Sequence, residues 1–180
     1  NNLINQDTIS FSVKVYEGIY DYKILKRLVK NKIKDVNISF DTKFDGNTDD
    51  CDYVINTSYA NINKINKTLG VPTLDLKFQD VVIPIFKMKS KPFGLTIMDG
   101  PFCSVMPKGR EENRFLLYNP KYSVLGESYE NNFKGDDFDI DIIYKESEKY
   151  FPFLSKVEPI GYWRTVRALP INNNDARMTK

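Results

Sequence analysis

The chain has 180 residues and a mass of 20.9 kDa, a length that favours one domain or little more. Its 26 lysines and arginines nearly balance 24 aspartates and glutamates, for a net charge of +2. This balance, without a basic block, excludes the electrostatic pattern typical of nucleic-acid-binding proteins. The absence of histidine excludes Ser-His-Asp triads, Cys-His pairs and histidine-ligated metal sites.

Cysteine usage and hydropathy indicate the compartment. The two cysteines, Cys51 and Cys103, are too few for a cysteine-only zinc site or a disulfide framework, so no metal is expected and both are predicted to be buried small hydrophobes. Because no apolar run approaches the ~18 residues of a membrane helix and no signal peptide is evident, we expect a cytoplasmic protein without a membrane partner. The chain starts without methionine, which favours a piece of a longer polypeptide.

The first part of the chain predicts alternating strands and helices. Short apolar or alternating runs predict strands at residues 9–15, 36–40 and 53–55. Asp21 is the expected N-cap of a helix whose later turns carry lysines, as the helix dipole prefers. A second helix is expected over residues 61–69, ending at Gly70.

The second part is mostly extended in pattern. Strands are predicted within residues 73–87, 95–98, 102–106, 114–118 and 156–169. Asp99-Gly100 predicts a hairpin, residues 107–110 predict the next turn, and Pro84 indicates an edge or a bulge. A helix is expected within residues 136–150, and Gly161 kinks the last strand. That strand is expected to face the core with Val157, Ile160, Tyr162 and Val166. The fold class is therefore α+β, with a mixed, largely antiparallel sheet and flanking helices.

Two segments contain residues suited to binding. Asn56, Thr57 and Ser58 follow an apolar run at a strand-to-helix junction, where exposed backbone N–H groups often hold a phosphate or sugar, although an ordinary capped loop has the same composition. Arg164 and Arg167 are three apart, so a strand points them to opposite faces. Either guanidinium would suit a carboxylate, or its stem would simply pack on Trp163, and Arg177 is a further candidate.

Taken in order, several segments resemble the D-amino-acid-oxidase-type FAD-dependent oxidoreductases. The segments are residues 16–28, 52–60 (DYVINTSYA), 99–107 (DGPFCSVMP), 115–118 with 123–125, and 164–177, which ends in LPINNNDAR. The resemblance implies a partial flavin-domain-like segment over residues 1–71 and a substrate-binding-like antiparallel sheet domain over residues 72–180. It also implies that Arg164 or Arg167 grips an anionic substrate and that Tyr118 and Tyr162 line the pocket. Asn56, Thr57 and Ser58 would then lie near FAD in the intact parent.

The departures from that family concern the cofactor. The G-x-G-x-x-G fingerprint is absent, and residues 56–59 replace a commoner glycine-containing turn. We therefore expect this chain not to hold FAD tightly and to be inactive as an enzyme by itself.

The sequence thus favours the substrate-binding portion of an FAD-dependent oxidoreductase that acts on a small anionic, amino-acid-like or sugar-derived substrate. The alternative is a non-catalytic domain that binds a small ligand or carbohydrate through an aromatic face of its sheet. It is motivated by 11 tyrosines and 12 phenylalanines without a complete catalytic constellation. A family member that kept the fold and lost the flavin is the third option. The sequence leaves the oligomeric state open.

Overall fold

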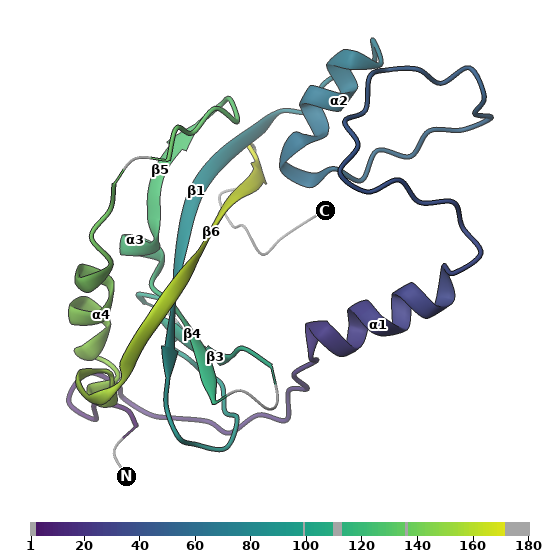
Figure 1. The fold of residues 1–180 in the computed structure, drawn as a ribbon. Helices are drawn as coiled ribbons and strands as arrows, with labels where there is room; N and C mark the ends of the chain where they lie inside the picture. Colours follow the sequence, from purple (N-terminus) through teal and green to yellow (C-terminus); the bar gives the residue numbers. More distant parts are fainter. Residues whose placement is uncertain (1–2, 99, 110–112, 136, 172–180) are drawn as a thin grey trace. The chain divides into compact units, whose positions relative to one another are not determined.

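The computed structural model describes residues 3–98, 100–109, 113–135 and 137–171, and it combines helices with a six-stranded sheet (Figure 1). The α+β class is confirmed. Asp99 of the hairpin motif and the candidate Arg177 lie outside the described residues. No helix in the described ranges is both long and apolar enough to cross a bilayer.

The sheet is built mainly from the second part of the chain. Its strands are β1 (Leu76–Lys87), β2 (Leu95–Thr96), β3 (Ser104–Pro107), β4 (Arg114–Tyr118), β5 (Val124–Ser128) and β6 (Glu158–Pro170). They follow the order β2-β3-β4-β1-β5, and β6 pairs with β1. The pairs β2–β3, β3–β4 and β1–β4 are antiparallel. Pairing of β1 with β4 begins at Ile85, directly after the buried Pro84, which has no backbone N–H to donate.

The first helix begins at its predicted N-cap residue. In α1 (Tyr22–Lys32), Asp21 Oδ1 accepts from the backbone N–H groups of Lys23 and Ile24. A 3-10 turn, η1 (Tyr59–Asn61), precedes α2 (Ile62–Thr68), and Gly70 follows with φ +67°. The remaining helical elements are α3 (Pro120–Ser123), α4 (Ile140–Glu148) and the 3-10 turn η2 (Pro152–Lys156).

The three strands predicted in the first part of the chain are wrong. Residues 9–15, 36–40 and 53–55 form no strand, and Phe11 and Val13 are 79% and 69% exposed. An alternating pattern becomes a strand only when another strand pairs with it and a layer covers its apolar face. Neither condition is met for these segments in the described structure.

Contacts between residues are concentrated within two compact units of the chain. The first unit comprises Asn1–Val36, Val82–Val124 and Asp137–Arg164, and the second comprises Asn37–Val81, Leu125–Asp136 and Thr165–Lys180. Each unit combines three separate segments of the chain. The predicted boundary between residues 71 and 72, which separates two continuous segments, stays a prediction.

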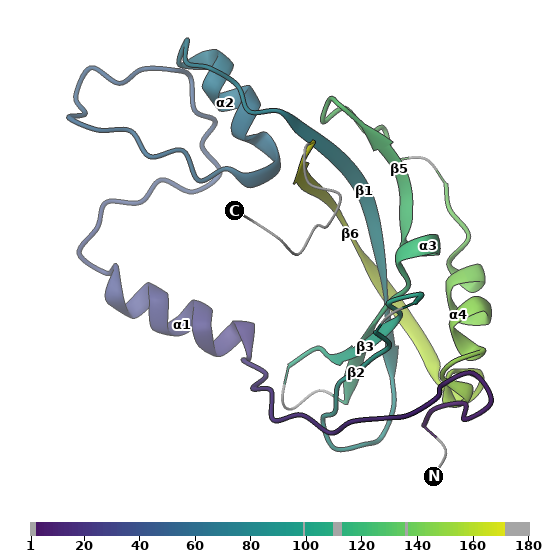
Figure 2. The ribbon, with the colours of Figure 1, turned by 180° about the vertical axis from the view of Figure 1, so that it is seen from behind.

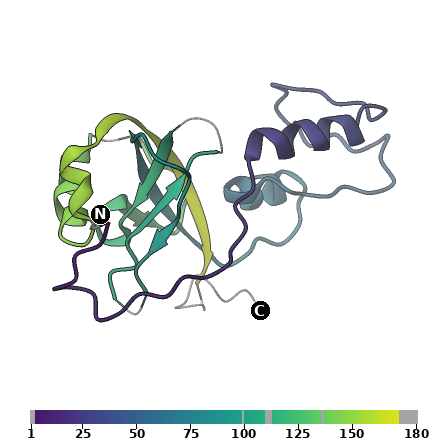
Figure 3. The same cartoon turned by 90° about the horizontal axis from the view of Figure 1, so that it is seen from below.

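The core of the first unit lies between strands and α4. Its largest fully buried side chains include Phe86, Phe115, Leu117 and Ile143. Figure 2 shows α3 beside α4, and Figure 3 shows α4 on one face of the strands. The predicted core face of β6 is wrong, because Ile160 and Tyr162 are exposed and Val157 and Val166 only half-buried. Side chains from β1, β3, β4 and α4 fill the interior instead.

Candidate functional site

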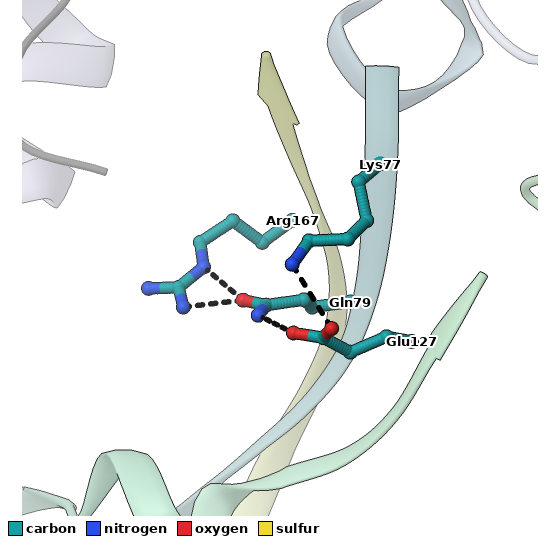
Figure 4. A network of polar contacts seen from close by, with 4 residues as sticks. All are labelled: Lys77, Gln79, Glu127 and Arg167. Carbon is teal, nitrogen blue, oxygen red and sulfur yellow. Dashed lines mark hydrogen bonds and ion pairs between the residues drawn. The ribbon is translucent and has the colours of Figure 1, made fainter. Parts of the chain in front are cut away.

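Four polar side chains of the second unit gather on three neighbouring strands. Lys77 and Gln79 are two residues apart on β1, so they share one face of the sheet. Glu127 comes from β5 and Arg167 from β6, and both strands pair with β1. The four side chains, which we call the β1 polar cluster, point toward one another in Figure 4.

Hydrogen bonds join the cluster into one chain of contacts. Gln79 Oε1 accepts from Arg167 Nε at 2.9 Å and also from Nη2 of the same guanidinium. Gln79 Nε2 donates to Glu127 Oε1, and Lys77 Nζ lies 3.0 Å from Glu127 Oε2. Along this chain of contacts, the guanidinium cation of Arg167 is followed by the neutral amide of Gln79, the carboxylate of Glu127 and the ammonium of Lys77. Gln79 is only 7% exposed, whereas the Lys77 and Glu127 side chains are 34% and 45% exposed.

The electrostatics of the cluster favour a charged Glu127. Hydrogen bonds from Gln79 and from Lys77 lower the pKa of the Glu127 carboxyl below its usual 4.5. A charged carboxylate accepts hydrogen bonds and donates none, so it requires the NH₂ end of the Gln79 amide to face it. The oxygen end then faces Arg167.

Arg164 has different surroundings from Arg167. It belongs to the first unit, and its guanidinium carbon lies 5.6 Å from the centre of the Phe138 ring. The Tyr162 ring meets the same Phe138 ring edge-on at 4.9 Å. Neither contact involves Trp163, which instead faces Tyr22 at 6.3 Å and Lys108 Nζ at 5.1 Å. Arg164 and Tyr162 therefore share an aromatic neighbour, as a cation–π pair and a ring pair.

Tyr118 lies at the end of β4, in the first unit. It is paired in register with Ser104 of β3, and its hydroxyl oxygen is buried. A buried hydroxyl suits a structural role as well as a pocket wall, so its assignment as a substrate contact stays a prediction.

The Asn56–Ser58 loop belongs to the second unit and is held by its own side chains. Asn56 Nδ2 donates to Ile62 O at 3.0 Å and to Asn66 Oδ1 at 2.7 Å. Asn56 Oδ1 accepts from the backbone N and the hydroxyl of Ser58. Thr57 is exposed. Asn56 and Ser58 thus use their polar groups to shape the loop.

Tyr59 connects this loop to β6. The backbone N of Ala168 donates to the Tyr59 hydroxyl at 3.3 Å. Tyr59 itself has φ +49°, a left-handed conformation that is uncommon for an aromatic residue. The loop predicted to lie near a cofactor therefore contacts the strand that carries Arg167, next to that residue.

The described residues do not form a complete flavin site. The Asn56 and Ser58 side chains are engaged within their loop, and no glycine-rich turn opens a helix to receive a pyrophosphate. Among the described residues, no three acidic or cysteine side chains gather in a way that would hold a metal ion.

Sequence reasoning missed three members of the β1 polar cluster, Lys77, Gln79 and Glu127. A signal for two of them was present, because Lys77 and Gln79 stand on either side of the apolar Phe78. Polar residues at alternate positions of a strand indicate a polar face. No local signal pairs that face with Arg167, which lies 88 residues away.

The comparisons with known proteins give one partial likeness. No family model matches the chain, and no curated protein matches it. A solved structure, that of glycine oxidase from Geobacillus kaustophilus, is similar with 12% identity and a TM-score of 0.47. The alignment covers 64% of this chain and 29% of that chain, so it spans less than a third of the oxidase.

Proposed function

We propose that this chain supplies the substrate-binding surface of an FAD-dependent oxidoreductase that acts on a small anionic substrate, amino-acid-like or sugar-derived. The observation that carries the proposal is the hydrogen bond between Tyr59 and Ala168. It links the segment with the family-like cofactor loop to the strand with the candidate substrate arginine, in one compact unit. The sequence resemblance by itself connects these segments only by their order.

Arg167 is the residue we assign to the substrate. A guanidinium is planar and always charged, and it binds a carboxylate through two parallel hydrogen bonds. Arg167 extends from β6 and is held on one side by Gln79. Arg164 lies against an aromatic ring, a setting that favours packing over anion binding.

The chemistry of such an enzyme divides between cofactor and protein. FAD, where bound, accepts the hydride, and the protein orients the substrate. In the proposal this chain orients the substrate, through the charge of Arg167 and through the sheet from which Arg167 extends. No histidine is required for this role, in agreement with the composition.

A titration with a simple carboxylate tests the assignment. Propionate is added to the ¹⁵N-labelled protein and followed by NMR, with the uncharged propionamide as the control ligand. We expect Arg167→Lys to weaken propionate binding about five- to tenfold, because lysine loses the paired hydrogen bonds. The matched variant Arg164→Lys is expected to bind as the wild type does. Equal affinity of all three proteins, or binding of propionamide as tight as propionate, contradicts the assignment.

The same proposal predicts how the chain behaves toward the cofactor. We expect purified protein to lack flavin absorbance and to bind added FAD only weakly, since no glycine-rich turn is present to receive the pyrophosphate. Absorbance spectroscopy and equilibrium dialysis measure this directly. A yellow protein with stoichiometric flavin would contradict it.

The alternative, a non-catalytic module for small ligands or carbohydrates, is supported by exposed aromatic side chains in the first unit. Tyr162 and Trp163 are 51% and 40% exposed, and flat aromatic faces suit sugar rings. A glycan array distinguishes the two functions. Glycan binding that Trp163→Ala abolishes, without any response to propionate, favours the binding module.

A further inference from the structure

Gln79 occupies the centre of the β1 polar cluster and is its most buried member. Its side chain is 7% exposed, and its amide meets a cation at one end and an anion at the other. A buried amide normally requires partners for both its oxygen and its nitrogen. Here Arg167 and Glu127 supply them, from the two strands that flank β1.

We propose that Gln79 is a positioning residue that orients the Arg167 guanidinium for an anionic ligand, an inference that rests on the proposed function. Gln79 engages the Nε–Nη2 edge of the guanidinium. It thereby fixes the plane of the guanidinium.

Glu127 determines which way the amide faces. With a carboxylate on one side and a guanidinium on the other, only one orientation of the amide makes both hydrogen bonds. The reversed amide would place its oxygen against Glu127 and its NH₂ against Arg167. Glu127 therefore acts on Arg167 through Gln79, and Lys77 steadies Glu127 at 3.0 Å.

The choice of glutamine over glutamate at position 79 carries the specificity. A neutral amide orients a guanidinium without neutralising it, whereas a glutamate in the same place would form an ion pair and repel an incoming anion. Gln79 thus combines two requirements, a fixed geometry and a retained positive charge. Both favour ligands with a carboxylate.

Two readouts separate positioning from binding. The Arg167 Nε–Hε signal in ¹⁵N NMR reports the order of the guanidinium, and it is assigned by its loss in Arg167→Lys. Propionate titration reports anion binding. The variants are Gln79→Met, which preserves length without an amide, and Gln79→Glu, which restores an acceptor but adds a charge.

We expect Gln79→Met to lose the slowly exchanging Nε–Hε signal and to bind propionate about three- to tenfold more weakly. Gln79→Glu is expected to keep the signal and still to lose affinity at least as strongly, a split that a merely structural role would not produce. Lys64→Met, at an exposed lysine of α2 in the same unit and outside the cluster, is the matched control and is expected to leave the signal and the affinity unchanged.

Retention of both the signal and the affinity in Gln79→Met overturns the inference. So does equal behaviour of Gln79→Met and Gln79→Glu. If Gln79→Met does not fold, Glu127→Gln replaces it, and faster exchange of the Arg167 signal is then required. If the signal depends on Gln79 while propionate binds no better to the wild type than to Arg167→Lys, positioning stands and the proposed function fails.

Discussion

Replacement of Ser147 by alanine tests whether a buried polar cluster stabilises the first unit. Ser147 and Cys103 are 0% exposed and Asn119 is 2% exposed. Ser147 Oγ accepts from Asn119 Nδ2 at 3.1 Å and from Cys103 Sγ at 3.3 Å. Within the described residues, Asn119 Oδ1 has no hydrogen-bond partner. Ser147 therefore provides the side-chain hydrogen bond that the buried amide of Asn119 makes.

The expected cost follows from the group left without that bond. An unsatisfied buried donor costs about 1–3 kcal/mol, and for a domain of this size each kcal/mol lowers Tm by about 2–4 °C. We expect Ser147→Ala to lose about 1–3 kcal/mol of unfolding free energy, measured by urea denaturation followed by circular dichroism.

A second variant distinguishes the lost bond from lost packing. Ser147→Ala combined with Asn119→Leu removes both polar partners and keeps the branched shape of residue 119, so most of the stability is expected to return. A Ser147→Ala protein within about 0.5 kcal/mol of the wild type would refute the reasoning. A double variant less stable than Ser147→Ala would refute it as well.

Three further predictions concern separate features. Cys103 is buried as predicted, whereas the prediction of a buried Cys51 is wrong, because that residue is exposed. Burial raises the pKa of the Cys103 thiol to about 11. Iodoacetamide at neutral pH is therefore expected to modify Cys51 and to reach Cys103 only after unfolding, as peptide mass spectrometry would show, and equal rates would contradict this. Because hydrogen bonds lower the pKa of Glu127 below 4.5, its contribution to stability is present above that pH and is lost as the pH falls through the lowered value. The Tm difference between wild type and Glu127→Gln is therefore expected to be small, given the exposure of the side chain, and to vanish in acid; a difference that grows in acid would reverse the sign. Gly70 has φ +67°, so Gly70→Ala is expected to lower the free energy of unfolding in urea by about 1–2 kcal/mol. Gly18→Ala, where an added Cβ would meet nothing within 4 Å, is the neutral control. Equal losses in the two variants would argue against backbone strain.

Local signals in the sequence predicted helix ends and one short strand. Asp21 caps α1 by accepting hydrogen bonds from the backbone N–H groups two and three residues further on. Gly70 follows the end of α2, because glycine adopts a positive φ without a Cβ clash. The strand predicted over residues 114–118 has the same bounds as β4. Each of these features depends on neighbours only a few residues away, which the sequence contains directly.

Other expectations failed where the outcome depends on distant partners. The run at residues 9–15 alternates like a strand and forms none, since alternation does not specify what pairs with it. Gly161, with φ +140°, separates the two halves of β6, and the residues expected to face the core from it are exposed or half-buried. A residue of a strand is buried only where another layer packs on its face of the sheet. The helix α4 packs on other strands.

The candidate site shows the same division. From the residue types and the order of motifs, the sequence predicted a guanidinium on the last strand as a candidate anion-binding group. Tertiary structure alone decided that Arg167 meets Gln79, which in turn meets Glu127, while Arg164 meets Phe138. The physical reason is strand pairing, because the register of β5 and β6 on β1 brings together side chains that no periodicity along one chain segment can relate.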